Sequence, residues 1–400
     1  MEPEIPAAPP APEAAPPIEP SGSLSLGYPG NDAGQTGTGP GNELEKPYHG
    51  LKWIFVGPDG GLRAGWSVLI FIGVLLLAGN GLGFLFSRLH LISKGNLFTP
   101  RQQVFLELLQ VIALVVAGTL MALIERRSIL DYNLRGPHRV RHFFSGLIVG
   151  FCALSALVGA LSLGGWIHFG PAALSGPAIF KYALIWGGWA FLVGCTEEGS
   201  MRCYFQFTLT RGINFWWAFG LIAVICGFLL IMAKGNGPVG VYIIALLGVA
   251  PCLLLHLAKA SSAGFWNAAW FTSTLFGFLH TGNNGENWIG IFAAAFIGFV
   301  FCVSIWVTGS AWWAIGCHAA WDWAETYFYG TADSGLVAPG HFLSTTPAGK
   351  PLWSGGTDGP EGSLLIIPVV LLLLAWLVIV YRRPHQDAIN ASGPAQQLAS

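Results

Sequence analysis

Apolar runs of about 20 residues recur along most of this chain, and they limit what it can fold into. A helix of about 20 apolar residues is long enough to cross the hydrocarbon core of a bilayer. Runs of this kind lie at roughly 66–87, 104–124, 143–166, 178–210, 215–233, 239–258, 264–281, 288–308, 309–328 and 363–381. The sequence therefore predicts an all-α fold, a polytopic transmembrane helical bundle of about 8–10 spans.

The composition is also that of a membrane protein. Hydrophobic residues make up 53% of the chain and charged residues only 10%, whereas soluble domains carry about 25% charged residues. The net charge of −1 gives no electrostatic reason to expect a nucleic-acid partner, so the lipid bilayer is the expected partner. The cysteines lie in or beside apolar runs without a C-x-x-C pair, so we expect neither disulfides nor a thiolate metal site.

The distribution of basic residues predicts the orientation in the membrane, because Lys and Arg are enriched in cytoplasmic loops. The loop 125–142 and the C-terminal end carry Arg126, Arg127, Arg135, Arg139, Arg141, Arg382 and Arg383. Placing both segments in the cytoplasm puts both termini there and the loop 329–362 outside. We expect an integral protein of the inner or plasma membrane.

Two adjacent glutamates follow an apolar run, where charge is hardest to accommodate. An ionised carboxylate at the centre of a membrane helix costs roughly 3 kcal/mol or more. Glu198 and Arg202 are four residues apart and share a helix face, which favours an ion pair. Glu197 points about 100° away from Glu198. One carboxylate can thus be held by arginine while Glu197 faces a cavity as a general base for water.

Two further segments add imidazole groups. His318 and Asp322 repeat the spacing of four residues, and an aspartate one turn from a histidine can fix its tautomer. Glu325 lies on the same stripe, one turn further along. His280 closes the seventh apolar run and precedes a polar loop.

These three segments resemble a known family. Glu197-Glu198-x-x-x-Arg202, Phe276-x-x-x-His280 and His318-x-x-x-Asp322 are similar to the ordered motifs of the CPBP (Abi) intramembrane proteases, relatives of the type II CAAX prenyl endopeptidase. The resemblance covers roughly residues 140–380. It implies a helical membrane bundle that hydrolyses a peptide bond of a membrane-associated protein or peptide inside a polar cavity.

The resemblance also implies roles for the motif residues. The residue matching Glu197 or Glu198 would activate water together with His280, and we favour Glu197 as the base. The residues matching His318 and Asp322 would stabilise the oxyanion. Arg202 would fix the second glutamate.

The implied organisation has four parts. Residues 1–48 are rich in Pro, Ala and Gly and are predicted to be a disordered tail. Residues 49–140 form N-terminal helices and a basic cytoplasmic loop, residues 141–382 form the protease core, and residues 383–400 form a second disordered tail.

The sequence departs from the family pattern in two places. Glu198 and His280 are separated by 82 positions (280 minus 198), where a few tens are usual, and residues 215–258 are predicted to be an inserted helical hairpin. Asp322 stands where many relatives have Asn. Because Asp donates a hydrogen bond only when protonated, its oxyanion role is in question, and it could instead orient His318 or join a metal site.

A metal centre is the alternative to metal-free chemistry. Glu197, His280, His318 and Asp322 together offer nitrogen and oxygen ligands that suit zinc. There is no H-E-x-x-H motif, in which one helix supplies two ligands. We therefore expect no cofactor, with glutamate chemistry favoured over a divalent metal such as zinc.

Other functions use the same residue types. Buried acids and histidines also mark transporters and proton-coupled carriers, and a non-catalytic immunity or scaffold protein could keep the fold without the chemistry. Each motif also has a structural reading: an ion network around Arg202, a backbone bond for His280, and a polar clamp for His318 with Asp322. The sequence names neither a substrate nor an oligomeric state.

Overall fold

The computed structural model describes residues 52–57, 60–93, 99–232, 238–283 and 285–381. These residues belong to one compact unit, Gly37–Ser400. The tails predicted at 1–48 and 383–400 lie outside the described residues.

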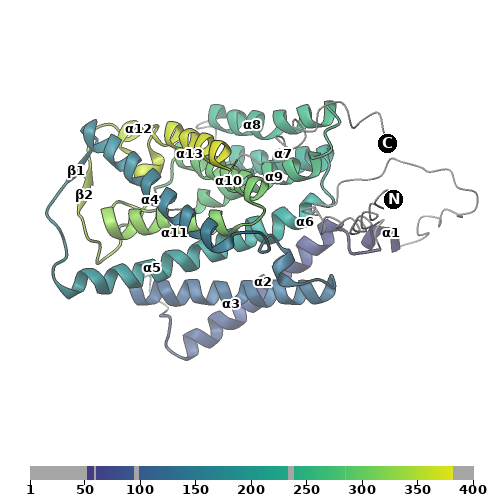
Figure 1. The fold of residues 1–400 in the computed structure, drawn as a ribbon, viewed down its shortest axis with the longest axis horizontal. Helices are drawn as coiled ribbons and strands as arrows, with labels where there is room; N and C mark the ends of the chain where they lie inside the picture. The colour runs from purple at the N-terminus through teal and green to yellow at the C-terminus, as the bar shows by residue number, and fades with distance from the viewer. Residues whose placement is uncertain (1–51, 58–59, 94–98, 233–237, 284, 382–400) are drawn as a thin grey trace, which may run out of the picture. The chain divides into compact units, whose positions relative to one another are not determined.

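The described chain is mostly helical (Figure 1), which confirms the predicted class. Its α-helices are α1 (Lys52–Phe55), α2 (Ala64–Arg88), α3 (Pro100–Ile124), α4 (Arg139–Leu163), α5 (Pro177–Glu198), α6 (Gln206–Thr210), α7 (Phe215–Met232), α8 (Pro238–Leu257), α9 (Ala263–Leu279), α10 (Trp288–Thr308), α11 (Trp312–Trp323), α12 (Pro351–Ser354) and α13 (Ile366–Val380). Tighter or wider helical turns occupy Ile129–Asp131, Gly199–Phe205, His280–Gly282, Ala324–Tyr329 and Pro360–Gly362. Two short antiparallel strands pair, β1 (Ile167–Phe169) with β2 (Thr345–Pro347).

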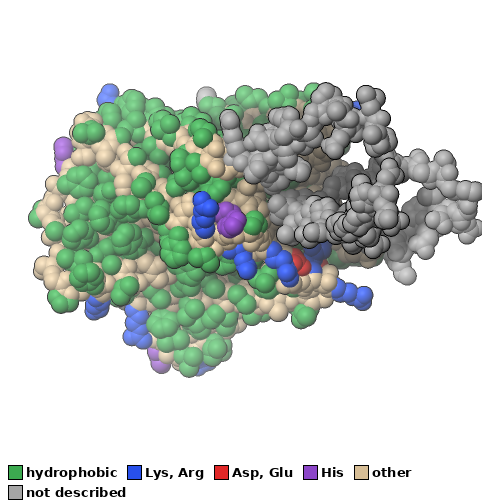
Figure 2. All heavy atoms as spheres, viewed as in Figure 1, with side chains coloured by type: hydrophobic (Ala, Val, Ile, Leu, Met, Phe, Trp, Pro, Cys, Tyr) green, Lys and Arg blue, Asp and Glu red, His purple; other side chains and the backbone are tan. Residues whose placement is uncertain are grey.

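Each predicted apolar run coincides with a helix. Within the described residues, six helices are long and apolar enough to cross a membrane. They are Ala64–Arg88, Pro100–Ile124, Arg139–Leu163, Pro177–Thr210, Phe215–Met232 and Trp288–Thr308. Two shorter apolar helices are Val241–Leu257 and Ile366–Val380. Figure 2 shows hydrophobic side chains over much of one face and few charged ones, as expected for a surface that contacts lipid.

Glycines bring α4 and α11 into backbone contact. A Cβ at Gly146 would collide with the carbonyl oxygen of Trp313, and one at Gly150 would collide with that of Cys317. From the other side, a Cβ at Gly316 would collide with the carbonyl oxygen of Phe143. This contact fixes the helix that carries His318.

The apolar run 178–210 forms one long helix that begins with α5. It continues through Gly194, which lets the backbone of α11 approach: a Cβ there would lie 3.1 Å from the carbonyl oxygen of Ile315. The irregularity comes later, where the helix widens to a π-helix over Gly199–Phe205 before continuing as α6.

The segment predicted as an inserted hairpin contains α7 and α8, which pack on each other and on α9. Their contact is apolar, with Ile222, Ile225 and Leu229 of α7 buried against Val241 of α8. The residues between the two helices, 233–237, lie outside the described part.

Candidate active site

His318 on α11 is the centre of the candidate active site. Its Nδ1 atom lies 2.9 Å from Oε1 of Glu198. Its Nε2 atom lies 3.7 Å from Oε2 of Glu197 and 3.6 Å from Oδ2 of Asp322. The other carboxylate oxygen of Glu198 is 3.2 Å from Nε of Arg202, the expected ion pair. The structure thus brings together five of the six residues singled out in the sequence.

The bonds of Glu198 set the orientation of the imidazole. A carboxylate beside an arginine only accepts hydrogen bonds, so Nδ1–H of His318 donates to Glu198. Nε2 is then the ring atom placed between Glu197 and Asp322. Of the two glutamates, Glu198 is fully buried, whereas the side chain of Glu197 is 37% exposed.

Arg202 is held by two aromatic rings as well as by Glu198. Its guanidinium carbon lies 4.5 Å from the ring centroid of Phe276 and 5.7 Å from that of Phe301. Such contacts stabilise a desolvated cation by about 2 kcal/mol. Phe301 also stacks on His318, with ring centroids 5.7 Å apart. One aromatic side chain therefore touches both the arginine and the imidazole.

Sequence analysis missed this contribution from α10, which carries Gly298 and Phe301. The run 288–308 contains no Asp, Glu, Lys, Arg or His, so no charged residue or histidine indicated a role in the site. A signal that could have been read is the glycine: Gly298 lies against the guanidinium of Arg202, where a larger residue has no room.

The π-helix shapes the arginine side of the site. Arg202 lies within Gly199–Phe205, and its backbone carbonyl accepts a hydrogen bond from Nδ2 of Asn133, 2.7 Å away. Single π-helical turns inside α-helices occur frequently at functional sites. A second π-helix, Ala324–Tyr329, continues α11 just after Asp322.

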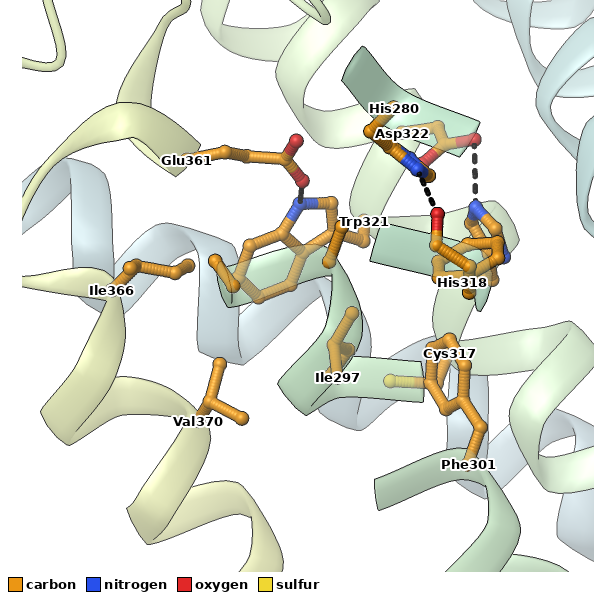
Figure 3. Close-up of a pocket in the computed structure, with 13 residues that line it drawn as sticks. His280, Ile297, Phe301, Cys317, His318, Trp321, Asp322, Glu361, Ile366 and Val370 are labelled. Carbon is orange, nitrogen blue, oxygen red and sulfur yellow. Dashed lines mark hydrogen bonds and ion pairs between the residues drawn. The ribbon is translucent and has the colours of Figure 1, made fainter. Parts of the chain in front are cut away.

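A cavity of about 40 Å³ lies beside His318 and Asp322. In Figure 3, the ion pair between His318 and Asp322 lies at one end of the cavity, and the hydrogen bond between Trp321 and Glu361 lies further along. Ile366 and Val370 of α13 line the far wall. A cavity of this volume holds a few waters, since one water needs roughly 10–15 Å³. Glu197 is not among the residues that line it, although its Oε2 atom lies 3.7 Å from Nε2 of His318.

His280 is the sixth of these residues, and it lines the same cavity. Within the described residues, no hydrogen bond or ion pair connects it to either glutamate. Its Nδ1 atom lies 2.8 Å from the carbonyl oxygen of Phe276, one turn back on α9. Because a carbonyl only accepts, Nδ1–H donates, and Nε2 is left as an acceptor.

A protein-family model matches part of this chain. Residues 252–324 match the family model of the type II CAAX prenyl endopeptidase Rce1-like proteins. Over these residues the chain is similar to the CAAX prenyl endopeptidases. The match covers less than half of the chain; it includes His280, His318 and Asp322 and ends before α13, while the glutamate motif precedes it. The searches of curated proteins and of solved structures gave no match. The CAAX protease relation indicates an integral membrane protein with peptidase activity in general.

The loop before α13 adds carboxyl groups near the cavity. Oε1 of Glu361 accepts a hydrogen bond from the Trp321 indole, 2.7 Å away. Burial, and then the charges of Asp333 and Asp358, raise the pKa of Glu361 from its usual 4.5 to about 8. Burial, and then the charge of Asp358, raise the pKa of Glu286 to about 8 as well. Sequence analysis assigned these loop acids no role in the site.

A zinc site was the alternative to metal-free chemistry. Within the described residues there is no group of three or more His, Cys, Asp or Glu side chains arranged to hold a metal ion. Of the four ligands considered, His280 bonds a backbone carbonyl through Nδ1, which leaves its Nε2 available as a ligand. Metal-free chemistry, with a divalent metal as the alternative, stays a prediction.

Proposed function

We propose that this protein is an intramembrane endopeptidase that hydrolyses a peptide bond of a membrane-associated protein or peptide. The observation that carries the proposal is His318, held between Glu198 and Glu197 at the edge of a water-sized cavity. The relation to the CAAX prenyl endopeptidases supports the same activity.

In the proposed mechanism, the carboxylate of Glu197 takes a proton from water. The resulting hydroxide adds to the carbonyl carbon of the substrate. His318, in its imidazolium form, donates from Nε2 to the oxyanion, and Glu198 with Arg202 keeps the ring in place. Nε2 of His280 is available to accept a hydrogen bond from a water in the cavity. The proton on Glu197 then passes to the leaving amine as the C–N bond breaks.

Asp322 has a positioning role in this scheme. Its carboxylate lies 3.6 Å from Nε2 of His318, so it favours the protonated ring. An ionised carboxylate has no hydrogen to donate to an oxyanion. This assignment accounts for an acid at a position where many relatives have Asn.

The test is cleavage of defined probes by the purified protein in lipid vesicles. Two quenched fluorescent peptide libraries are compared, one anchored by a farnesyl group and one by an apolar helix. We expect the parent to cleave one of them and Glu197→Gln to lose at least about 100-fold in rate. Glu197→Asp keeps the charge and should retain part of the activity. Because Glu197 is partly exposed, its variants should keep the parent's thermal stability.

Two results would contradict the proposal. The first is cleavage by Glu197→Gln at the parent's rate. The second is the absence of cleavage of both libraries by the parent, together with uptake of protons or solutes into the vesicles that depends on Glu197, which would identify a carrier instead.

A further inference from the structure

A second cavity, of about 280 Å³, lies between α8, α9, α10 and α13. Its lining residues are Leu247, Gly248, Trp270, Ser273, Thr274, Phe292, Ala295, Phe296, Ile367 and Leu371. Its volume is close to the lower end of ligand pockets, about 300 Å³. The cavity beside His318 is much smaller, so the larger space is the one with room for a ligand of some length.

The two cavities lie on opposite sides of the same helices. On α13, Ile366 and Val370 line the cavity beside His318, whereas Ile367 and Leu371 line the larger one. The residues of α10 are divided between the two cavities in the same way. The larger cavity is thus a separate site that shares its backbone support with the candidate active site.

The lining of the larger cavity is unsuited to water or to a polar ligand. Its two hydroxyl groups already have partners in the protein: Thr274 donates to the carbonyl oxygen of Trp270, 2.8 Å away, and Ser273 lies 3.9 Å from Sγ of Cys302. A buried water needs two to four polar partners. The remaining lining residues are glycine, aliphatic or aromatic, so the lining favours a hydrocarbon occupant.

The surroundings of the cavity identify the source of that hydrocarbon. Leu246 on α8 is 65% exposed, and Leu371 and Leu372 on α13 are 50% and 71% exposed. Exposed leucines on helices of this apolar composition face the bilayer. The cavity is therefore continuous with a lipid-facing surface.

We propose that this cavity binds one acyl chain of a bilayer phospholipid. One wall comes from α8, within the segment predicted as an inserted hairpin, so the site depends on that segment. The proposal is independent of the proposed peptidase activity, because it involves none of the residues around His318.

The experiment uses the full chain in phosphatidylcholine vesicles that contain a phosphatidylcholine with a photoactivatable diazirine on one acyl chain. After illumination, labelled peptides are mapped by mass spectrometry. We expect α10 and α13 to be labelled several-fold more than α2, whose exposed Leu76 and Leu77 report ordinary contact with lipid. Leu371→Trp, which places a larger side chain in the cavity, should remove this excess.

The matched control is Leu372→Trp, because Leu372 is the adjacent lipid-facing leucine and does not line the cavity. It should leave the labelling unchanged. Leu247→Trp repeats the test from the α8 wall. Labelling of α10 and α13 no greater than that of α2, or an excess that survives both Leu371→Trp and Leu247→Trp, would overturn the proposal. Displacement of the label by a farnesylated peptide would also overturn it, since the cavity would then belong to a substrate.

Discussion

Gly298 on α10 leaves the space that the guanidinium of Arg202 occupies, because a Cβ at this position would collide with Nη2. Nη1 and Nη2 have no hydrogen-bond partner among the described residues. The arginine is therefore positioned by its ion pair with Glu198, by the rings of Phe276 and Phe301, and by the absence of a side chain at Gly298.

Gly298→Ala should displace Arg202 and loosen its hold on Glu198. We expect the free energy of unfolding to fall by about 1–3 kcal/mol, as for other overpacked cores. Peptidase activity should fall as well. Thermal unfolding in detergent measures the first effect. Gly220→Ala on α7 is the control, since a Cβ there meets nothing within 4 Å and should be tolerated. Equal stability of the two variants would show that Arg202 is not confined by α10.

Arg202→Ala should be more damaging, because it leaves Glu198 buried without its cation. Breaking a buried pair in this way costs about 3–5 kcal/mol. Arg202→Lys restores the charge but not the planar group that stacks between the two phenylalanine rings, so its stability and activity should lie between those of parent and alanine variant. If the lysine variant matches the parent in both, the aromatic contacts have no role.

Asp322→Asn tests the acid at the end of the third motif. The amide removes the charge that favours the protonated ring of His318, 3.6 Å away, but its NH₂ group can itself donate to an oxyanion. We expect cleavage within about tenfold of the parent, and a much larger loss in Asp322→Ala, which has neither the charge nor the NH₂ group. Rates of the two variants on the same probe decide between them. Equal cleavage rates for the Asn and Ala variants would show that Asp322 has no positioning role.

The loop that precedes α13 should detach more readily as the pH rises. Burial, and then Asp333 and Asp358, raise the pKa of Glu361 to about 8, so the docked loop keeps a proton that a detached loop, with the usual 4.5, has lost. The contribution of this proton to docking is complete below about pH 4.5 and is lost as the pH rises to about 8. The pH dependence of loop detachment is measured by hydrogen exchange of residues 355–363, corrected for intrinsic exchange rates. Glu361→Gln keeps an acceptor for Trp321 and should reduce the dependence, with Glu286 and Asp358 contributing the remainder. Protection that rises with pH would contradict the assignment.

The helices could be predicted because a membrane span needs length and apolar composition, and both are visible in the sequence. The Glu198–Arg202 pair followed from helix periodicity, since four residues make about one turn. The sequence also placed His318 near Asp322 for the same reason. Local spacing was enough for contacts within one helix.

Contacts between helices were beyond this reasoning. The approach of His318 to both glutamates depends on how α5 packs against α11, and the π-helix at Gly199–Phe205 has no signature in composition or periodicity. His280 was expected beside the glutamates, but its Nδ1 bonds its own helix. The role of Phe301 was hidden because an aromatic residue in an apolar run is ordinary packing.

The glycine contacts between α4 and α11 restrict how this protein can move. Where two helices touch through their backbones at Gly146, Gly150 and Gly316, neither sliding nor rotation is open to them without atomic overlap. His318 therefore lies on a helix that is fixed along this seam of close backbone contact. Any rearrangement that admits or releases a peptide has to take place in the elements around that seam, with the imidazole as the stationary reference point.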